Sequence, residues 1–199
     1  MSILKFVCDK NGFLFVVLFV VMFKIESHLS KLAEHFSRRV HSETGCTYDG
    51  VAYDKHLDHV YEVYYRYSYL LDDSVKTFVE CGIWLHDVME DCRISYEELS
   101  IMFGVEVADL VYALTNELGK TRSDIVKRTY PKIRDHGDLA IFVKLCDRIA
   151  NTEASLRDGN EKYRSLYFLE YFYFKQALKT DAWDIMWLHL DSLHTRLCE

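Results

Sequence analysis

Apolar residues recur at helical spacing along most of the chain beyond residue 24. The first such stripe is Ile25, Leu29, Leu32, Phe36 and Val40, because side chains three and four residues apart lie on one face of an α-helix. No stretch combines alternating apolar and polar residues with hairpin turn signals. The pattern therefore predicts an all-α fold.

Capping residues and glycines divide the rest of the chain into further helices. Ser95 followed by Glu98 is a capping box for a short helix that Phe103 and Gly104 end. Residues 41–55 are irregular in pattern, and residues 121–129 are polar and basic. We expect the other helices at about residues 56–71, 75–91, 105–116, 139–156, 161–178 and 182–193.

The run from Phe13 to Phe23 is uninterrupted and apolar. It is too short for a membrane-spanning helix, which needs ~20 residues, and no small-x-small cleavage site follows it. A membrane-associated leader, a buried segment and a true start at Met22 remain open, and membrane association through residues 13–23 is not favoured. We assign residues 1–24 to a leader or a mis-assigned start, and residues 25–199 to a single domain.

Composition narrows the class of protein. Half of the 199 residues are apolar and one is proline, which is typical of a globular chain. The net charge of -7 disfavours nucleic acid as a partner. The six cysteines are scattered without a C-x-x-C pair, which excludes a zinc finger and favours reduced thiols in the cytoplasm.

The segment GIWLHDVMED, residues 82–91, carries the strongest chemical signal. On a continuous helix His86 shares a face with Glu90, and Asp87 shares one with Asp91. Four ionisable groups beside a core surface repel one another unless a cation lies among them. A divalent metal would remove that penalty.

An adjacent His-Asp pair supplies two ligands at most, so partners must come from elsewhere in the chain. His56 begins the preceding helix, and Asp147 lies among apolar residues at core spacing in IFVKLCDRIANTE. A salt bridge with Lys144 or Arg148 is the alternative for Asp147, and the residues alone favour it slightly. A mixed nitrogen and oxygen set suits Mn(II), Fe(II), Mg(II) or zinc.

Three ordered motifs resemble those of the HD-domain metal-dependent phosphohydrolases. YDKHLDHV is similar to Y-x-x-H-P-x-x-V, with Leu57 in place of proline. The second motif is LHDVMEDCRISYEELSIMFGVEVADLVYALT, which resembles the L-H-D-V-V-E-D-T run of the alarmone hydrolases and its continuation. The third motif is VKLCDRIANTE, which resembles their K-L-A-D-R-x-x-N. The resemblance covers about residues 25–180, and it is closest to the hydrolase domain of RelA/SpoT proteins and the stand-alone small alarmone hydrolases.

The resemblance implies an HD-domain helical bundle and a set of roles. It implies that one Mn(II) is bound by His56, His86, Asp87 and Asp147. It also implies that Glu90 and Asp91 serve the attacking water and that Asn151 lies near the substrate. The implied activity is hydrolysis of the 3′-pyrophosphate of guanosine tetra- or pentaphosphate (ppGpp and pppGpp), the alarmones of the stringent response.

The chain departs from the family where the guanine base is held. The arginine and second basic residue before the first histidine fall near Thr47 and Tyr48 here, and Lys55, Arg38 or Arg39 could replace the lost charge. The arginine and threonine after the family asparagine are Glu153 and Ala154. We therefore keep two alternatives: hydrolysis of another nucleotide or nucleotide cofactor, and a non-catalytic nucleotide-binding protein.

A basic stretch lies between the second and third motifs. Its members are Lys120, Arg122, Lys127, Arg128 and Lys132. A solvated helix face is the plainer interpretation, but the position of the stretch makes phosphate binding by Arg122, Lys127 and Arg128 a reasonable expectation.

Overall fold

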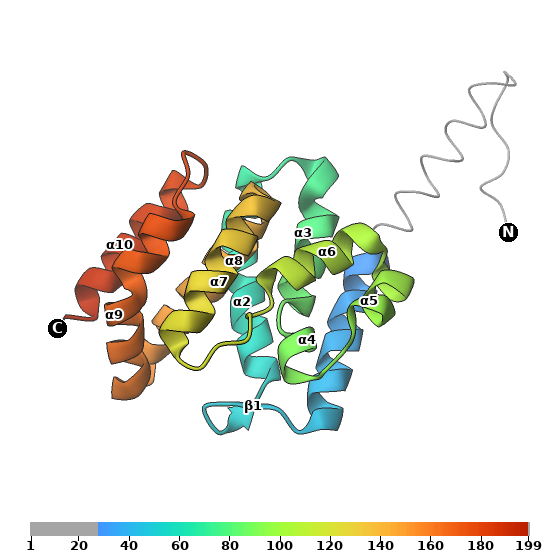
Figure 1. Ribbon diagram of the computed structural model, residues 1–199, viewed down its shortest axis with the longest axis horizontal. Coiled ribbons are helices and arrows are strands. Elements are labelled where there is room, and N and C mark those ends of the chain that lie inside the picture. Colours follow the sequence, from blue (N-terminus) through green and yellow to red (C-terminus); the bar gives the residue numbers. More distant parts are fainter. Residues whose placement is uncertain (1–27, 199) are drawn as a thin grey trace, which may run out of the picture.

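The computed structural model describes residues 28–198, and most of them are helical (Figure 1). A first helix covers residues 28–44. The elements that follow are β1 (Thr47–Tyr48), β2 (Val51–Ala52), α2 (Asp54–Tyr67), η1 (Ser68–Leu70), α3 (Asp73–Leu85), α4 (Val88–Asp91), α5 (Tyr96–Phe103), α6 (Val105–Leu114), α7 (Arg122–His136), α8 (Asp138–Arg157), α9 (Glu161–Leu178) and α10 (Asp184–Arg196). The all-α expectation is confirmed. The expected leader, residues 1–24, lies outside the described residues.

Two apolar clusters hold the bundle together. The larger joins α2, α3, α6 and α7 to α8, α9 and α10, and the smaller joins the first helix to α3, α5 and α6. Helix α8 is buried nearly all round, from Ala140 to Ala150 with only Lys144 partly exposed. An ionised side chain in the middle of α8 therefore needs a compensating partner.

The expected helix over residues 75–91 is interrupted. Helix α3 ends at Leu85, His86 and Asp87 form a turn, and α4 begins at Val88. Adjacent residues on a continuous helix point about 100° apart, whereas here the side chains of His86 and Asp87 converge, with Nε2 and Oδ2 2.9 Å apart. The prediction of one helix was wrong because this convergence requires a break.

A short antiparallel hairpin occupies part of the segment expected to be irregular. Thr47 pairs with Ala52 and Tyr48 with Val51. Asp49 and Gly50 between them have φ of 53° and 81°, as a tight two-residue hairpin turn requires. Strands of two residues are too short to show alternation, so the pattern missed them.

The first helix turns its predicted stripe, Leu29, Phe36 and Val40, to the core, and the prediction is wrong only at Leu32 among the described residues. Leu32 is 45% exposed, whereas Ala33 is fully buried beside Phe36 and Val40. Of the predicted stripe, Ile25 lies outside the described residues.

Helix α7 was not expected, because residues 121–129 show only a polar and basic pattern, but several other boundaries follow the sequence closely. The capping box of Ser95 and Glu98 is present, and α5 ends at Gly104. Gly137 separates α7 from α8 with a φ of 112°, which side chains other than glycine rarely adopt. Within the described residues, no helix has the length and apolar character that crossing a membrane requires.

Candidate active site

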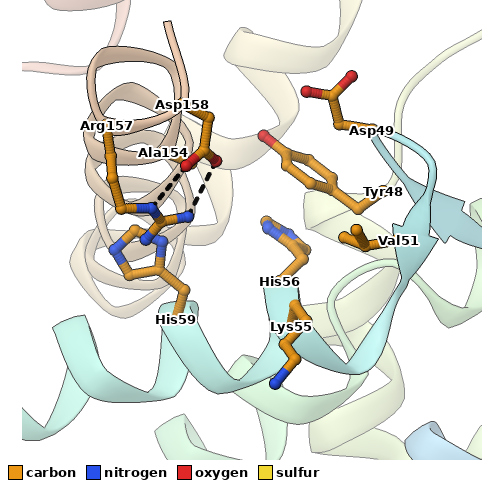
Figure 2. Close-up of a pocket in the computed structure, with 9 residues that line it drawn as sticks. All are labelled: Tyr48, Asp49, Val51, Lys55, His56, His59, Ala154, Arg157 and Asp158. Atoms are coloured by element: carbon orange, nitrogen blue, oxygen red, sulfur yellow. Dashed lines mark hydrogen bonds and ion pairs between the residues drawn. The ribbon is translucent and has the colours of Figure 1, made fainter. Parts of the chain in front are cut away.

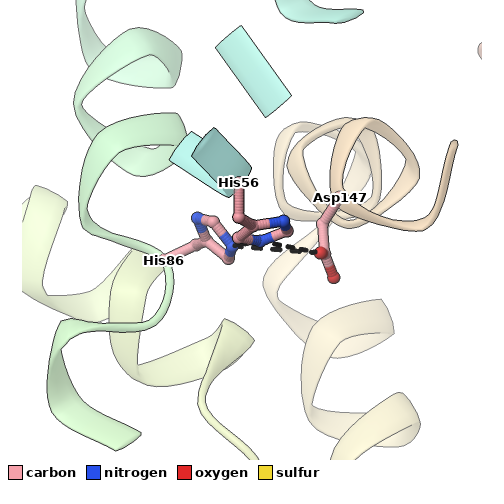
Figure 3. A group of neighbouring side chains, drawn as sticks. All are labelled: His56, His86 and Asp147. Atoms are coloured by element: carbon pink, nitrogen blue, oxygen red, sulfur yellow. Dashed lines mark hydrogen bonds and ion pairs between the residues drawn. The ribbon is translucent and has the colours of Figure 1, made fainter. Parts of the chain in front are cut away.

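Three helices bring the expected ligand residues together. His56 lies in the first turn of α2, His86 and Asp87 follow α3, and Asp147 lies in the middle of α8. Figure 3 shows both imidazole rings meeting the Asp147 carboxylate. His56, His86 and Asp147 are 4%, 3% and 6% exposed. The group is therefore shielded from bulk water.

The spacing of the donor atoms fits one metal ion. His56 Nε2 lies 3.3 Å from His86 Nε2, 3.7 Å from Asp87 Oδ2 and 3.6 Å from Asp147 Oδ1. His86 Nε2 lies 2.9 Å from Asp87 Oδ2 and 3.9 Å from Asp147 Oδ1. Ligands about 2.1 Å from a shared octahedral ion lie about 3.0 to 4.2 Å apart. The buried His-His-Asp group, joined by Asp87, can therefore hold a divalent cation.

The electrostatics of the four residues favour positive charge at their centre. Burial by itself would lower the pKa of His86, but the charges of Asp87 and Asp147 raise it to about 9. Burial alone would likewise raise the pKa of Asp87, yet the neighbouring histidines hold it well below its usual range. A bound divalent cation would satisfy the same carboxylates with the histidines neutral.

Surrounding groups hold the four side chains in place. The Tyr53 hydroxyl donates to Asp87 Oδ2, and His86 Nδ1 lies 2.9 Å from the Ile83 carbonyl oxygen. Partners of this kind fix the orientation of metal ligands. Sequence reasoning gave Tyr53 no role, although its position three residues before His56 in the Y-x-x-H motif was an available signal.

Asp147 makes the salt bridge with Lys144 that the sequence left open, and it does so within the cluster that could hold a metal. Lys144 Nζ donates to Asp147 Oδ2 at 2.8 Å, and Asn151 Nδ2 donates to Oδ1. Burial would raise the pKa of Asp147, but the Lys144 charge holds it below its usual range. Arg148 does not take part, because it pairs with Glu170.

Glu90 and Asp91 lie at the rim of the same site. Glu90 accepts hydrogen bonds from the backbone N and the side-chain Nδ2 of Asn116, at 3.2 and 2.9 Å. Desolvation, with the nearby Asp87 charge, raises the pKa of Asp91 to about 6. A carboxylate with this pKa is suited to proton transfer near neutral pH.

A cleft of about 370 Å³ opens over these residues. Besides His56, Asp87, Asp147, Glu90 and Asp91, its walls are formed by Thr47, Tyr48, Tyr53, Asn116, Arg122, Lys144, Arg148, Asn151, Tyr163, Leu166 and Tyr167. Three of these residues, Arg122, Lys144 and Arg148, are cationic. The cleft therefore combines acidic residues that can hold a metal with a cationic wall that can bind anions.

The two arginines of this wall are held by one carboxylate. Arg122 Nε donates to Glu170 Oε1 at 2.7 Å, and Arg148 Nη2 donates to Glu170 Oε2 at 2.9 Å. Lys127 and Arg128, expected at the same site, do not line the cleft, and Arg128 donates instead to the Leu118 carbonyl oxygen. Of the expected basic residues, the structure thus brings Arg122 to the cleft.

Tyr48 lines this cleft and, with His56, also a second pocket. Its ring stacks on His56 with centroids 4.7 Å apart, and its hydroxyl donates to Asn151 Oδ1 at 2.6 Å. The second pocket, of about 240 Å³, is drawn in Figure 2. It is lined by Tyr48, Asp49, Val51, Lys55, His56, His59, Ala154, Arg157 and Asp158.

Glu153, which stands on α8 where the family has arginine, has structural partners. Glu153 accepts from His59 Nε2 at 2.8 Å and from Arg66 Nη1 at 2.6 Å. Of the three cations considered as replacements, Lys55 lines the second pocket, whereas Arg38 is paired with Glu34 and Asp58. Arg39 lies 3.9 Å from the Glu43 carboxylate.

Comparison with known proteins supports the fold. No protein-family profile and no curated protein sequence matches the chain. Among solved structures, it is similar to a metazoan ortholog of SpoT that hydrolyzes ppGpp and plays a role in starvation responses. The TM-score is 0.67 at 19% identity, over 84% of this chain and 94% of that one. The expected HD-domain bundle is confirmed as the fold.

Proposed function

We propose that this chain is a metal-dependent phosphohydrolase that removes the 3′-pyrophosphate of guanosine tetra- or pentaphosphate, releasing pyrophosphate. The observation that carries the proposal is a buried cluster of His56, His86 and Asp147, with Asp87 2.9 Å from His86 and the carboxylates of Glu90 and Asp91 in the adjoining cleft. The similar fold of the ppGpp-hydrolysing SpoT ortholog supports it. A cytoplasmic location, expected from the scattered cysteines, is part of the proposal.

His56, His86, Asp87 and Asp147 would hold the metal, for which we propose Mn(II). Two imidazoles and two carboxylates form a donor set that several divalent ions accept, and the resemblance to the alarmone hydrolases selects manganese among them. When bound, the ion would polarise a phosphoryl oxygen and lower the pKa of water.

The chain's own carboxylates would manage the proton. Asp91, with its pKa near 6, would accept the proton of the attacking water, and Glu90 would relay it. The two donors of Asn116 hold the Glu90 carboxylate in one orientation. Such a pair favours an enzyme over a protein that only binds nucleotide, because binding needs no proton acceptor.

The cationic wall would bind the phosphates. Arg122, Lys144 and Arg148 face the same cleft as the metal cluster, and phosphate oxygens accept charge-assisted hydrogen bonds from such groups. Asn151, whose side chain lies between Tyr48 and Asp147, would add a neutral contact to the nucleotide.

The residues expected to hold the nucleotide base support a second candidate function, hydrolysis of another nucleotide or nucleotide cofactor. Tyr48 can stack on a base, and Thr47 can donate a neutral hydrogen bond, but neither supplies the charge or fork of a guanidinium. Glu153 is already paired with His59 and Arg66. We expect modest discrimination between guanosine and adenosine substrates.

The test is to incubate Mn(II)-loaded protein with guanosine tetraphosphate, its adenosine counterpart, GTP and a dinucleotide cofactor, measuring pyrophosphate and orthophosphate separately. The proposal expects pyrophosphate from guanosine tetraphosphate, and a loss of release in the Asp91→Asn control that still binds metal. Release from other nucleotides only would select the second candidate. No release from any nucleotide by metal-loaded protein would refute enzymatic function and select a nucleotide-binding role.

A further inference from the structure

Two cysteines contact one threonine hydroxyl beside the cleft, and neither belongs to the metal cluster. Cys46 lies between the first helix and β1, and Cys92 directly follows α4. The Thr44 hydroxyl oxygen contacts both sulfur atoms, at 3.1 Å from Cys46 Sγ and 3.6 Å from Cys92 Sγ. Cys46 Sγ also lies 3.5 Å from the carbonyl oxygen of Asp91, the residue before Cys92.

The two thiols differ in access to solvent. Cys46 is partly exposed, whereas Cys92 is 7% exposed. Burial raises the pKa of the Cys92 thiol to about 12, and contact with Cys46 adds to the effect. A dissolved oxidant therefore meets Cys46 first, and Cys92 is placed to react with the product.

We propose that Cys46 and Cys92 form an oxidation site that a peroxide converts to an intramolecular disulfide. The Cys46 thiolate attacks one peroxide oxygen, the O–O bond breaks, and a sulfenic acid and hydroxide result; the hydroxide takes up the proton that the Cys46 thiol released and becomes water. The Cys92 sulfur then attacks the Cys46 sulfur, the S–O bond breaks, and hydroxide leaves with the Cys92 proton as water. Two thiols lose two electrons and two protons, and one peroxide becomes two waters.

The disulfide would tie two walls of the cleft together. Thr47 and Tyr48 follow Cys46 directly, and Glu90 and Asp91 precede Cys92. Both pairs line the cleft, and the sulfurs must approach to about 2.05 Å in the bond. We expect oxidation to slow hydrolysis reversibly, and this consequence alone rests on the proposed function.

The test uses the full chain with Cys8→Ser and Cys198→Ser, which removes one cysteine outside the described residues and one exposed cysteine. Protein treated with hydrogen peroxide is alkylated and digested with trypsin without reduction. Cleavage after lysine and arginine leaves Cys46 in peptide 40–55, and Cys81 with Cys92 in peptide 77–93. Fragment spectra of the linked peptides must therefore assign the bond to Cys92 or to Cys81.

The expected result is a Cys46–Cys92 link that dithiothreitol reverses, absent from the matched Cys46→Ser variant. Closing this loop should raise Tm by about 5 °C or more. Free thiols at both positions after peroxide treatment, or a bond to Cys81, would overturn the site. A disulfide that leaves pyrophosphate release unchanged would overturn its effect on the cleft. No release even from reduced protein would count against the proposed function, while the mass spectrum would still decide the site.

Discussion

Replacing Glu153 by glutamine tests how helix α8 is anchored. Glu153 joins α8 to His59 and Arg66 on α2, and its carboxylate lies 3.5 Å from His189 Nε2 on α10. Burial opposes ionisation, but His59 and Arg66 lower the pKa of Glu153 from 4.5 to about 2. Each pKa unit corresponds to about 1.4 kcal/mol. Because the side chain is 19% exposed, we expect the charge to contribute about 2 to 3 kcal/mol.

The sign of the pH dependence follows from the lowered pKa. A carboxyl group whose pKa is lower in the folded protein stabilises it above pH 4.5, and this contribution is lost as pH falls toward 2. Glu153→Gln should therefore lower the free energy of unfolding by about 2 to 3 kcal/mol at pH 7, and by less at pH 3.

Urea unfolding followed by circular dichroism at pH 7, 5, 4 and 3 measures this difference. Glu43→Gln is the matched control, because its carboxylate is 67% exposed and lies 3.9 Å from Arg39; it should change stability little. If Glu153→Gln lowers the free energy of unfolding by the same amount at pH 7 and pH 3, the electrostatic reasoning is refuted and the effect is assigned to packing.

Three further predictions concern the cleft and the core. Glu90→Gln and Asp91→Asn should keep bound metal and lower kcat by ~10²–10⁴. A wild-type kcat in both variants would show that the carboxylate pair has only a structural role. Arg122→Gln should raise KM for the nucleotide, whereas Lys127→Gln, on the same helix but outside the cleft lining, should not; equal effects on KM would contradict the assignment of the phosphate wall. Gly82→Ala places a methyl group 2.6 Å from a leucine carbon of α6, so the free energy of unfolding should fall by about 1 to 3 kcal/mol. An unchanged Tm would contradict that packing argument.

The helical architecture could be predicted because the local signals agree with the packing. The bounds of α9 match the expected range, and the Ser95 capping box forms as its spacing indicates. The hairpin was missed although Asp49-Gly50 is a strong two-residue turn signal. Its strands carry too few residues for a periodic pattern, so only the dipeptide could have revealed it.

Motif order picked out the candidate ligand residues that the structure brings together, whereas their supporting contacts could not be predicted. The break after Leu85, which lets His86 and Asp87 converge, depends on tertiary packing that helical periodicity cannot register. The Arg148 to Glu170 pair likewise joins α8 to α9 across the bundle. Contacts between helices distant in sequence require the fold itself, which explains why Lys127 and Arg128 were expected in a cleft that they do not line.

The most direct test of the account is a titration of Mn(II) into metal-stripped protein while bound metal and pyrophosphate release from guanosine tetraphosphate are measured together. We expect release to rise in step with binding and to level off at one ion per chain. Asp147→Ala should show neither tight binding nor release, because it removes one of the four donors. Full metal occupancy in Asp147→Ala, or wild-type release from protein without bound metal, would contradict the proposed centre.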